Sequence, residues 1–149
     1  MHTHIPTQSE IEALFATENP ACVTIYLPTS VLPQEAQADR IAFKNQVHTA
    51  IELLRDHGAS RDDIEEITDE LTEIEEDSNF WANQAHSLAV FATPERVITY
   101  QLPNRLTEAV QVSDRFYVKP LLRAVSFPQA AFVLALSQGS VRLVRVSAD

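Results

Sequence analysis

Residues 60–77 show a helical pattern that strongly limits how this chain can fold. The apolar positions of this segment recur at intervals of three, four and three residues: Ile64, Ile67, Leu71 and Ile74. All the other side chains between residues 61 and 77 are polar. Such spacing predicts a helix with one narrow apolar seam, which is suited to burial against a neighbouring helix.

The segment from about Glu35 to His57 predicts that neighbouring helix. Its apolar residues fall on one helical stripe: Phe43, Val47, Ala50, Ile51 and Leu54. Gly58 follows the stripe and can supply the left-handed position that ends many helices. We therefore expect an antiparallel helical hairpin in which the seam contacts Val47, Ile51 and Leu54. Trp81, the only tryptophan, is expected to anchor this hairpin against a sheet.

The rest of the chain predicts strands and two short helices. Runs rich in β-branched residues alternate with period two, which is typical of strands. Strands are expected at 22–27, 87–92, 96–102, 109–112, 131–137 and 140–146, and short helices at 9–16 and from Pro120. This order predicts an α+β fold with a largely antiparallel sheet.

The length of 149 residues fits one domain. Residues 131–146 predict a hairpin around Gln138 and Gly139, and the chain ends three residues later. We expect residues 1–149 to be a single N-terminal domain of a longer protein, whose next domain could begin with this hairpin. The apolar run from Phe132 to Leu136 predicts an exposed apolar patch or a dimer contact there.

Several classes of site are excluded by residue counts and spacing. Cys22 is the only cysteine, so the chain has no internal disulfide, and its alternation with core-facing residues favours a packed thiol. Gly58 and Gly139 stand apart, whereas phosphate-cradling loops need clustered glycines. The five histidines lack the i, i+4 spacing of helical zinc motifs.

No apolar stretch approaches the ~20 residues that cross a bilayer. We expect a cytoplasmic protein without metal or cofactor.

The formal charge of −10 is unevenly distributed. Residues 60–86 hold one basic and ten acidic side chains, a net charge of −9, whereas residues 87–149 hold seven basic and four acidic ones, a net charge of +3. An acidic protein ordinarily repels nucleic acid. This uneven distribution is compatible with a basic surface away from the acidic helix.

Two groups of basic residues have helical spacing. Arg40, Lys44 and His48 follow at i, i+4 and i+8, and Arg115, Lys119 and Arg123 have the same spacing across a strand-to-helix junction. Either group could be a solvated surface paired with nearby acids, or a set of phosphate contacts. We predict that five of these residues form one positive surface separate from the acidic helix: Arg40, Lys44, Arg115, Lys119 and Arg123.

Four ordered segments carry a resemblance to a known family. They are Val23–Thr29, Asp39–Asn45, Phe80-Trp81 with Leu88–Phe91, and Asp114–Leu122, followed by Leu134–Gln138 and Val141–Leu143. Together they resemble the N-terminal region of the bacterial relatives of archaeo-eukaryotic peptide-chain release factors. The resemblance implies a three-domain parent similar to release factors and Pelota, with an N-terminal domain near the decoding site. The Gly-Gly-Gln motif of the release-factor middle domain is absent from this sequence.

The resulting hypothesis is a non-catalytic N-terminal domain that positions a translation-associated factor on the ribosome or its RNA. An alternative is a protein-interaction module that uses the acidic helix 60–77 and binds no nucleic acid. A third, weaker hypothesis is a small enzyme that uses Asp114, Arg115 and Lys119, although their spacing defines no reaction.

Overall fold

The computed structural model describes residues 2–125, 130–137 and 140–147, the last two ranges as backbone only. The elements follow in this order: α1 (Gln8–Ala16), β1 (Cys22–Pro28), the 3₁₀ turn η1 (Pro33–Glu35), α2 (Ala36–Asp56), α3 (Arg61–Glu76), α4 (Ser78–Ala82), β2 (Ser87–Thr93), β3 (Arg96–Leu102), β4 (Ala109–Ser113), α5 (Lys119–Ala124), β5 (Ala130–Ser137) and β6 (Ser140–Ser147). The predicted α+β class is confirmed.

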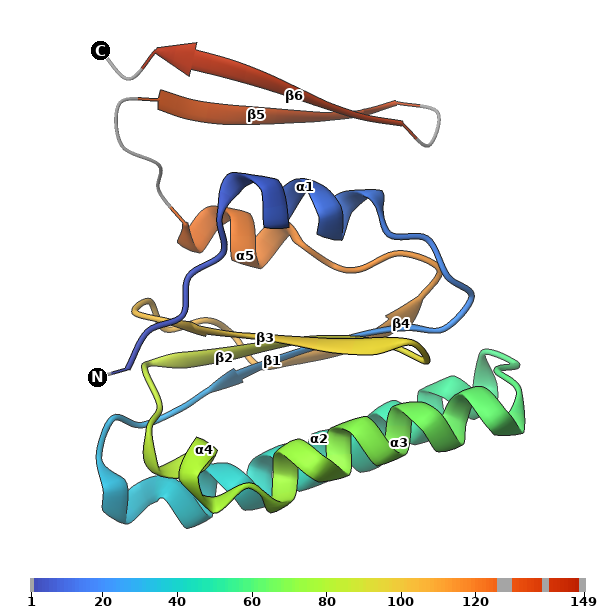
Figure 1. The fold of residues 1–149 in the computed structure, drawn as a ribbon, viewed down its shortest axis with the longest axis vertical. Coiled ribbons are helices and arrows are strands. Elements are labelled where there is room, and N and C mark those ends of the chain that lie inside the picture. The colour runs from blue at the N-terminus through green and yellow to red at the C-terminus, as the bar shows by residue number, and fades with distance from the viewer. Residues whose placement is uncertain (1, 126–129, 138–139, 148–149) are drawn as a thin grey trace.

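A four-stranded antiparallel sheet lies at the centre of the fold, in the order β3-β2-β1-β4. In this register Ile25 of β1 lies opposite Val90 of β2 on one side and Val110 of β4 on the other. Helices cover both faces of the sheet: α2, α3 and α4 lie on one face, and α1 and α5 on the other (Figure 1). Because of this double cover, β1 and β2 are buried along almost their whole length.

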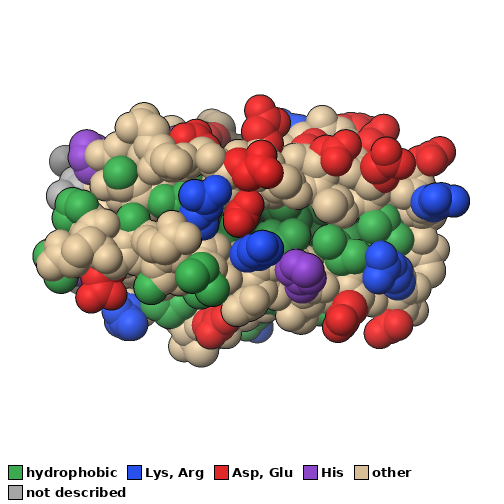
Figure 2. All heavy atoms as spheres, turned by 90° about the horizontal axis from the view of Figure 1, so that it is seen from below, with side chains coloured by type: hydrophobic (Ala, Val, Ile, Leu, Met, Phe, Trp, Pro, Cys, Tyr) green, Lys and Arg blue, Asp and Glu red, His purple; other side chains and the backbone are tan. Residues whose placement is uncertain are grey.

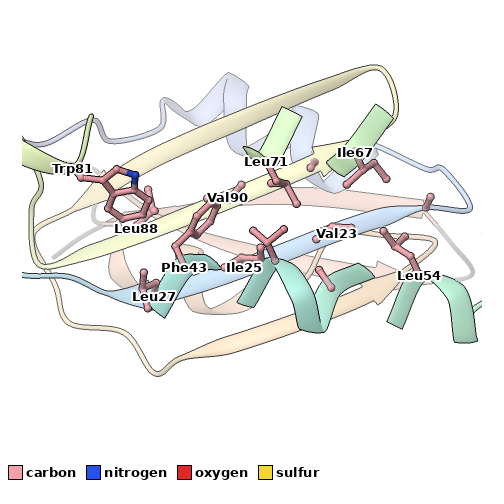
Figure 3. Close-up of a cluster of buried hydrophobic side chains, with 14 residues drawn as sticks. Val23, Ile25, Leu27, Phe43, Leu54, Ile67, Leu71, Trp81, Leu88 and Val90 are labelled. Atoms are coloured by element: carbon pink, nitrogen blue, oxygen red, sulfur yellow. The ribbon is translucent and has the colours of Figure 1, made fainter. Parts of the chain in front are cut away.

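The α2–α3 hairpin packs on its face of the sheet through the residues that the helical patterns predicted. Ile67 and Leu71 of α3 are fully buried in one cluster with Phe43 and Leu54 of α2. Figure 3 shows these side chains converging on Val23, Ile25, Leu27, Leu88 and Val90 of the sheet. Ile64, Ile74 and Ile51 complete the contact as partly buried residues. The predicted packing of the two helices is therefore confirmed, and the sheet lies beneath both.

The ends of the two helices are set by local sequence. Gly58 adopts a φ of 85°. Its N–H donates to the carbonyl of Arg55, and the next N–H, of Ala59, donates to that of Leu54, which is the Schellman arrangement. The Ser60 hydroxyl then accepts the N–H of Asp63 at 3.1 Å and starts α3.

The short helix α4 was not predicted from the sequence. Asp77 ends α3, and its carboxylate accepts the N–H of Phe80 at 3.1 Å, so one residue caps both helices. This turn brings Trp81 under the hairpin, where its indole N–H donates to the Ile74 carbonyl at 3.0 Å. The Trp81 ring lies 5.3 Å from that of Phe43, which confirms its predicted anchoring role.

The opposite face of the sheet carries a second cluster, beneath α1 and α5. Its largest buried side chains come from the strands and from both helices: Leu14, Tyr26, Phe91, Tyr100, Leu102 and Leu121. Thr7 and Glu10 form a reciprocal capping box at the start of α1. Cys22 is buried, and burial raises the pKa of its thiol to about 11, as befits the predicted packed thiol.

Strands β5 and β6 pair as an antiparallel hairpin, from Ala130 opposite Ser147 to Ser137 opposite Ser140. They form a two-stranded sheet separate from the central one. The predicted turn at Gln138 and Gly139, and the predicted exposure of the run from Phe132 to Leu136, lie outside what the structure describes. That this hairpin begins another domain stays a prediction.

Candidate nucleic-acid interface

The five basic candidates occupy two separate parts of the structure. Arg40 and Lys44 belong to α2, on the face of the sheet that α3 shares. Lys119 and Arg123 belong to α5, on the opposite face, and Arg115 lies just before that helix. The expectation of one positive surface is therefore corrected. Equal four-residue spacing places residues along one helix, but it does not determine which face of a sheet the helix covers.

Arg40 takes part in the hairpin's own packing. Its guanidinium lies 3.7 Å from a carboxylate oxygen of Glu75 on α3. This ion pair corresponds to the alternative considered above, in which basic residues of the first helix pair with acids of the second. Lys44 is exposed one turn further along α2. Both partners of the Arg40–Glu75 pair are partly buried, with 27% and 18% of their side-chain surface exposed.

Arg115 links the segment before α5 to the end of α1. Its guanidinium donates to the Phe15 carbonyl and to the Glu18 carboxylate, both at 3.3 Å. The neighbouring Asp114 accepts the backbone N–H of Asn19 through its carbonyl at 3.1 Å. These contacts hold α1 against the strand-to-helix connection, so Arg115 has a structural role.

Lys119 and Arg123 are both exposed, and Arg123 lines a pocket of about 310 Å³ beside α5. The second cation of this pocket is Arg105, an exposed residue of the loop between β3 and β4. The remaining lining comes from Leu106, Thr107, Ala109, Tyr117 and Pro120. We call this site the basic pocket. Sequence reasoning missed Arg105 because residues 103–108 have no periodic pattern.

Hydrogen bonds from the sheet hold both walls of the basic pocket. The N–H of Leu106 donates to the buried Ser87 hydroxyl at 2.7 Å, which fixes the wall that carries Arg105. The N–H of Tyr117 donates to the Thr24 hydroxyl at 3.0 Å. The Tyr26 hydroxyl donates to the Tyr117 carbonyl, so two side chains of β1 hold one residue of the other wall. Burial raises the pKa of the Tyr26 hydroxyl, which keeps this donor protonated.

The acidic helix α3 lies on the other side of the sheet. Figure 2 shows acidic side chains gathered along α3. An apolar strip lies beside them, between α2 and α3, and basic and histidine side chains border this strip. Glu70 is half-buried there, and one of its carboxylate oxygens is buried without a hydrogen-bond partner among the described residues. Burial, and secondarily the charge of Glu66, raise the pKa of Glu70 to about 7.

Two further pockets lie on the α2–α3 side. One of about 230 Å³ is lined by Arg40 and Trp81, and one of about 380 Å³ by Arg55 and Arg61 at the helical turn. Within residues 2–125, no group of three or more His, Cys, Asp or Glu side chains is placed to hold a metal ion. None of the described helices is long and apolar enough to cross a membrane.

The comparisons with known proteins identify the fold alone. No family model matches the chain, and no curated protein matches it. A solved structure described as "Archaeal protein" is similar, with a TM-score of 0.55 and 11% sequence identity. The similarity covers 98% of this chain and 46% of that one. The chain thus spans about half the length of this structural neighbour.

Proposed function

We propose that this chain is a non-catalytic, release-factor-like domain of a translation-associated protein, and that it contacts RNA through the α5 side of its sheet. The observation that carries the proposal is the separation of charge. Exposed Lys119, Arg123 and Arg105 lie around α5 and the neighbouring loop, whereas the acidic α3 lies across the sheet. The sequence segments that resemble the release-factor relatives supply the link to translation.

The distance between these two surfaces makes RNA contact compatible with a net charge of −10. Helices pack about 8–10 Å from the elements they cover, so the acidic face of α3 lies on the order of 20 Å from α5 across the sheet. The Debye length at physiological ionic strength is about 8 Å. Repulsion from α3 is therefore largely screened at α5, while phosphates in direct contact with Lys119 and Arg123 still release their counterions.

A second candidate function is the protein-interaction module. Its support is the gathering of acidic side chains along α3. A basic protein segment would bind there without any contribution from α5. The two proposals thus assign binding to opposite faces of the same sheet.

Association of the 149-residue chain with ribosomes and with ribosomal RNA, measured across a salt series, tests the first proposal. The test variant combines Lys119→Glu and Arg123→Glu. A matched control combines Arg55→Glu and Arg61→Glu, which changes the net charge equally at two exposed residues of the distant helical turn. A third variant, Glu65→Lys with Asp69→Lys, alters the exposed surface of α3.

RNA contact predicts weaker association for the α5 variant alone. The slope of log affinity against log salt should fall by about 1.4, as expected when two contacts to single-stranded RNA are lost. Loss confined to the α3 variant would instead support the protein-interaction module. Absence of any association with ribosomes or RNA at low salt would refute the translation proposal.

A further inference from the structure

We infer that the basic pocket holds one unpaired nucleotide of an RNA strand, with its phosphate on Arg105 and Arg123 and its base on the Tyr117 ring. This inference rests on the proposed RNA contact and names the chemical group recognised. A free nucleotide and a nucleotide in a strand both present a phosphate beside a planar base.

The two guanidinium groups suit the phosphate. Arg105 and Arg123 line the same pocket from different segments, a loop and a helix. Both are exposed, and neither forms an ion pair with a carboxylate among residues 2–125. Burial raises the pKa of Asp39, and the charge of Arg105 only partly opposes this rise. The Asp39 carboxylate accepts the Ser30 N–H at 2.9 Å. The planar donors of an arginine guanidinium match the oxygens of a phosphate.

Tyr117 supplies a fixed aromatic surface for the base. Its backbone is held by Thr24 and Tyr26, and its ring packs edge-on against the Tyr26 ring, with centroids 6.1 Å apart. The side chain is only partly buried and lines the pocket. A held but accessible ring stacks a base with little loss of side-chain entropy, as in single-strand binding sites.

The size of the pocket limits its occupant. A volume of about 310 Å³ lies at the lower end of the roughly 300–1,000 Å³ typical of ligand sites. The apolar side chains of Leu106, Ala109 and Pro120 and the hydroxyl of Thr107 complete the lining. One base with its phosphate matches this size and mixture, whereas paired bases do not expose their faces for stacking.

The two pockets described above on the α2–α3 side lack this combination. The Arg40 pocket has an aromatic neighbour in Trp81, but Trp81 is buried in the core, and Arg40 is paired with Glu75. The pocket at the helical turn has Arg55 and Arg61 but no aromatic side chain in its lining. The Arg55 site therefore provides a control with cations and no stacking surface.

Calorimetric or NMR titration of the 149-residue chain tests the inference. The probes are adenosine 5′-monophosphate, adenosine, inorganic phosphate and a five-nucleotide single-stranded oligoadenylate. The variants are Tyr117→Leu, Tyr117→Phe, Arg105→Gln and Arg123→Gln, with Arg55→Gln as the matched control. Thermal unfolding of each variant checks that the fold is retained, and the two exposed arginines test the site even if Tyr117→Leu unfolds.

The monophosphate should bind more tightly than adenosine or phosphate alone, and the oligonucleotide more tightly still. Tyr117→Leu should weaken binding about fivefold or more, the lower end of the contribution of a stacked base. Tyr117→Phe should retain affinity because it keeps the ring. Arg105→Gln and Arg123→Gln should each weaken binding of the monophosphate and the oligonucleotide, and Arg55→Gln should weaken neither.

Equal affinity of all variants for the monophosphate and the oligonucleotide would overturn the pocket assignment. Binding of the monophosphate without preference for the oligonucleotide would show a free-nucleotide site instead of an RNA contact. If ribosome association depends on Lys119 and Arg123 while the titrations show no binding, the proposed function stands and this inference fails. Tight nucleotide binding without any ribosome or RNA association would refute the proposed function and would replace the RNA contact by a free-nucleotide site.

Discussion

Glu70 makes the stability of this fold depend on pH. The ordinary pKa of its carboxyl group is 4.5, and burial together with the Glu66 charge raises this pKa to about 7. Between these two values the folded state binds a proton that the unfolded state has already released. Stability therefore falls as the pH rises from about 4.5 to about 7, and the full penalty persists above that range.

The size of the penalty follows from the position of the side chain. One pKa unit corresponds to about 1.4 kcal/mol, so the full shift would correspond to about 3 kcal/mol. Glu70 is only half-buried, although one carboxylate oxygen is inaccessible and unpartnered among the described residues. Solvent screening at the exposed part reduces the expected penalty to about 1 kcal/mol.

The variant Glu70→Gln removes this charge while keeping the shape of the side chain. Its free energy of unfolding should exceed that of the unmodified protein by about 1 kcal/mol at pH 8 and should match it near pH 4, where Glu70 is protonated. Urea unfolding at both pH values measures the difference. Glu73→Gln, which removes an exposed charge from the same helix, is the control and should change stability by about 0.5 kcal/mol or less. A gain for Glu70→Gln that is the same at pH 4 and pH 8 would refute the reasoning.

Three further predictions concern the fold. Leu71→Ala should lower the free energy of unfolding by about 2–5 kcal/mol in urea, because Leu71 is fully buried between α2 and the sheet; a loss below about 1 kcal/mol would contradict that packing. Gly58→Ala should lower it by about 1–2 kcal/mol, because a Cβ has open space there but strains the backbone at a φ of 85°; unchanged stability would exclude this strain. Cys22 should be alkylated by iodoacetamide at pH 8 much more slowly in the folded than in the urea-unfolded protein, because burial raises its pKa to about 11; equal rates would show an accessible thiol.

The local sequence pattern was sufficient to predict the helices and strands that have a regular apolar period or a characteristic capping residue. The seam from Ile64 to Ile74 predicted α3 and its contact with α2, because a helix with one apolar stripe has only one face to bury. Gly58 predicted the end of α2, because its positive φ is determined by a few neighbouring residues. The short helix α4 was missed, since five residues are too few to show a period.

The candidate site depended instead on contacts between residues distant in sequence. The spacing of Arg115, Lys119 and Arg123 did not reveal that Arg115 would be held by Phe15 and Glu18 of the N-terminal segment. Nor did similar spacing on α2 show that Arg40 would lie across the sheet from α5. The face on which a helix packs is decided by the connections and by strand order, which i, i+4 spacing does not encode.

The sequence by itself therefore determined every helix except α4, the strands, the α2–α3 seam and the acidic character of α3, because each depends on the order of neighbouring residues. Tertiary structure alone decided that the acidic and basic surfaces lie on opposite faces of the sheet and that Arg105, Tyr117 and Arg123 share a pocket. That pocket exists because Ser87 holds the loop of Leu106 while Thr24 and Tyr26 hold Tyr117. These contacts join residues 19 to 93 positions apart, and they form only when the strands are paired in the order β3-β2-β1-β4.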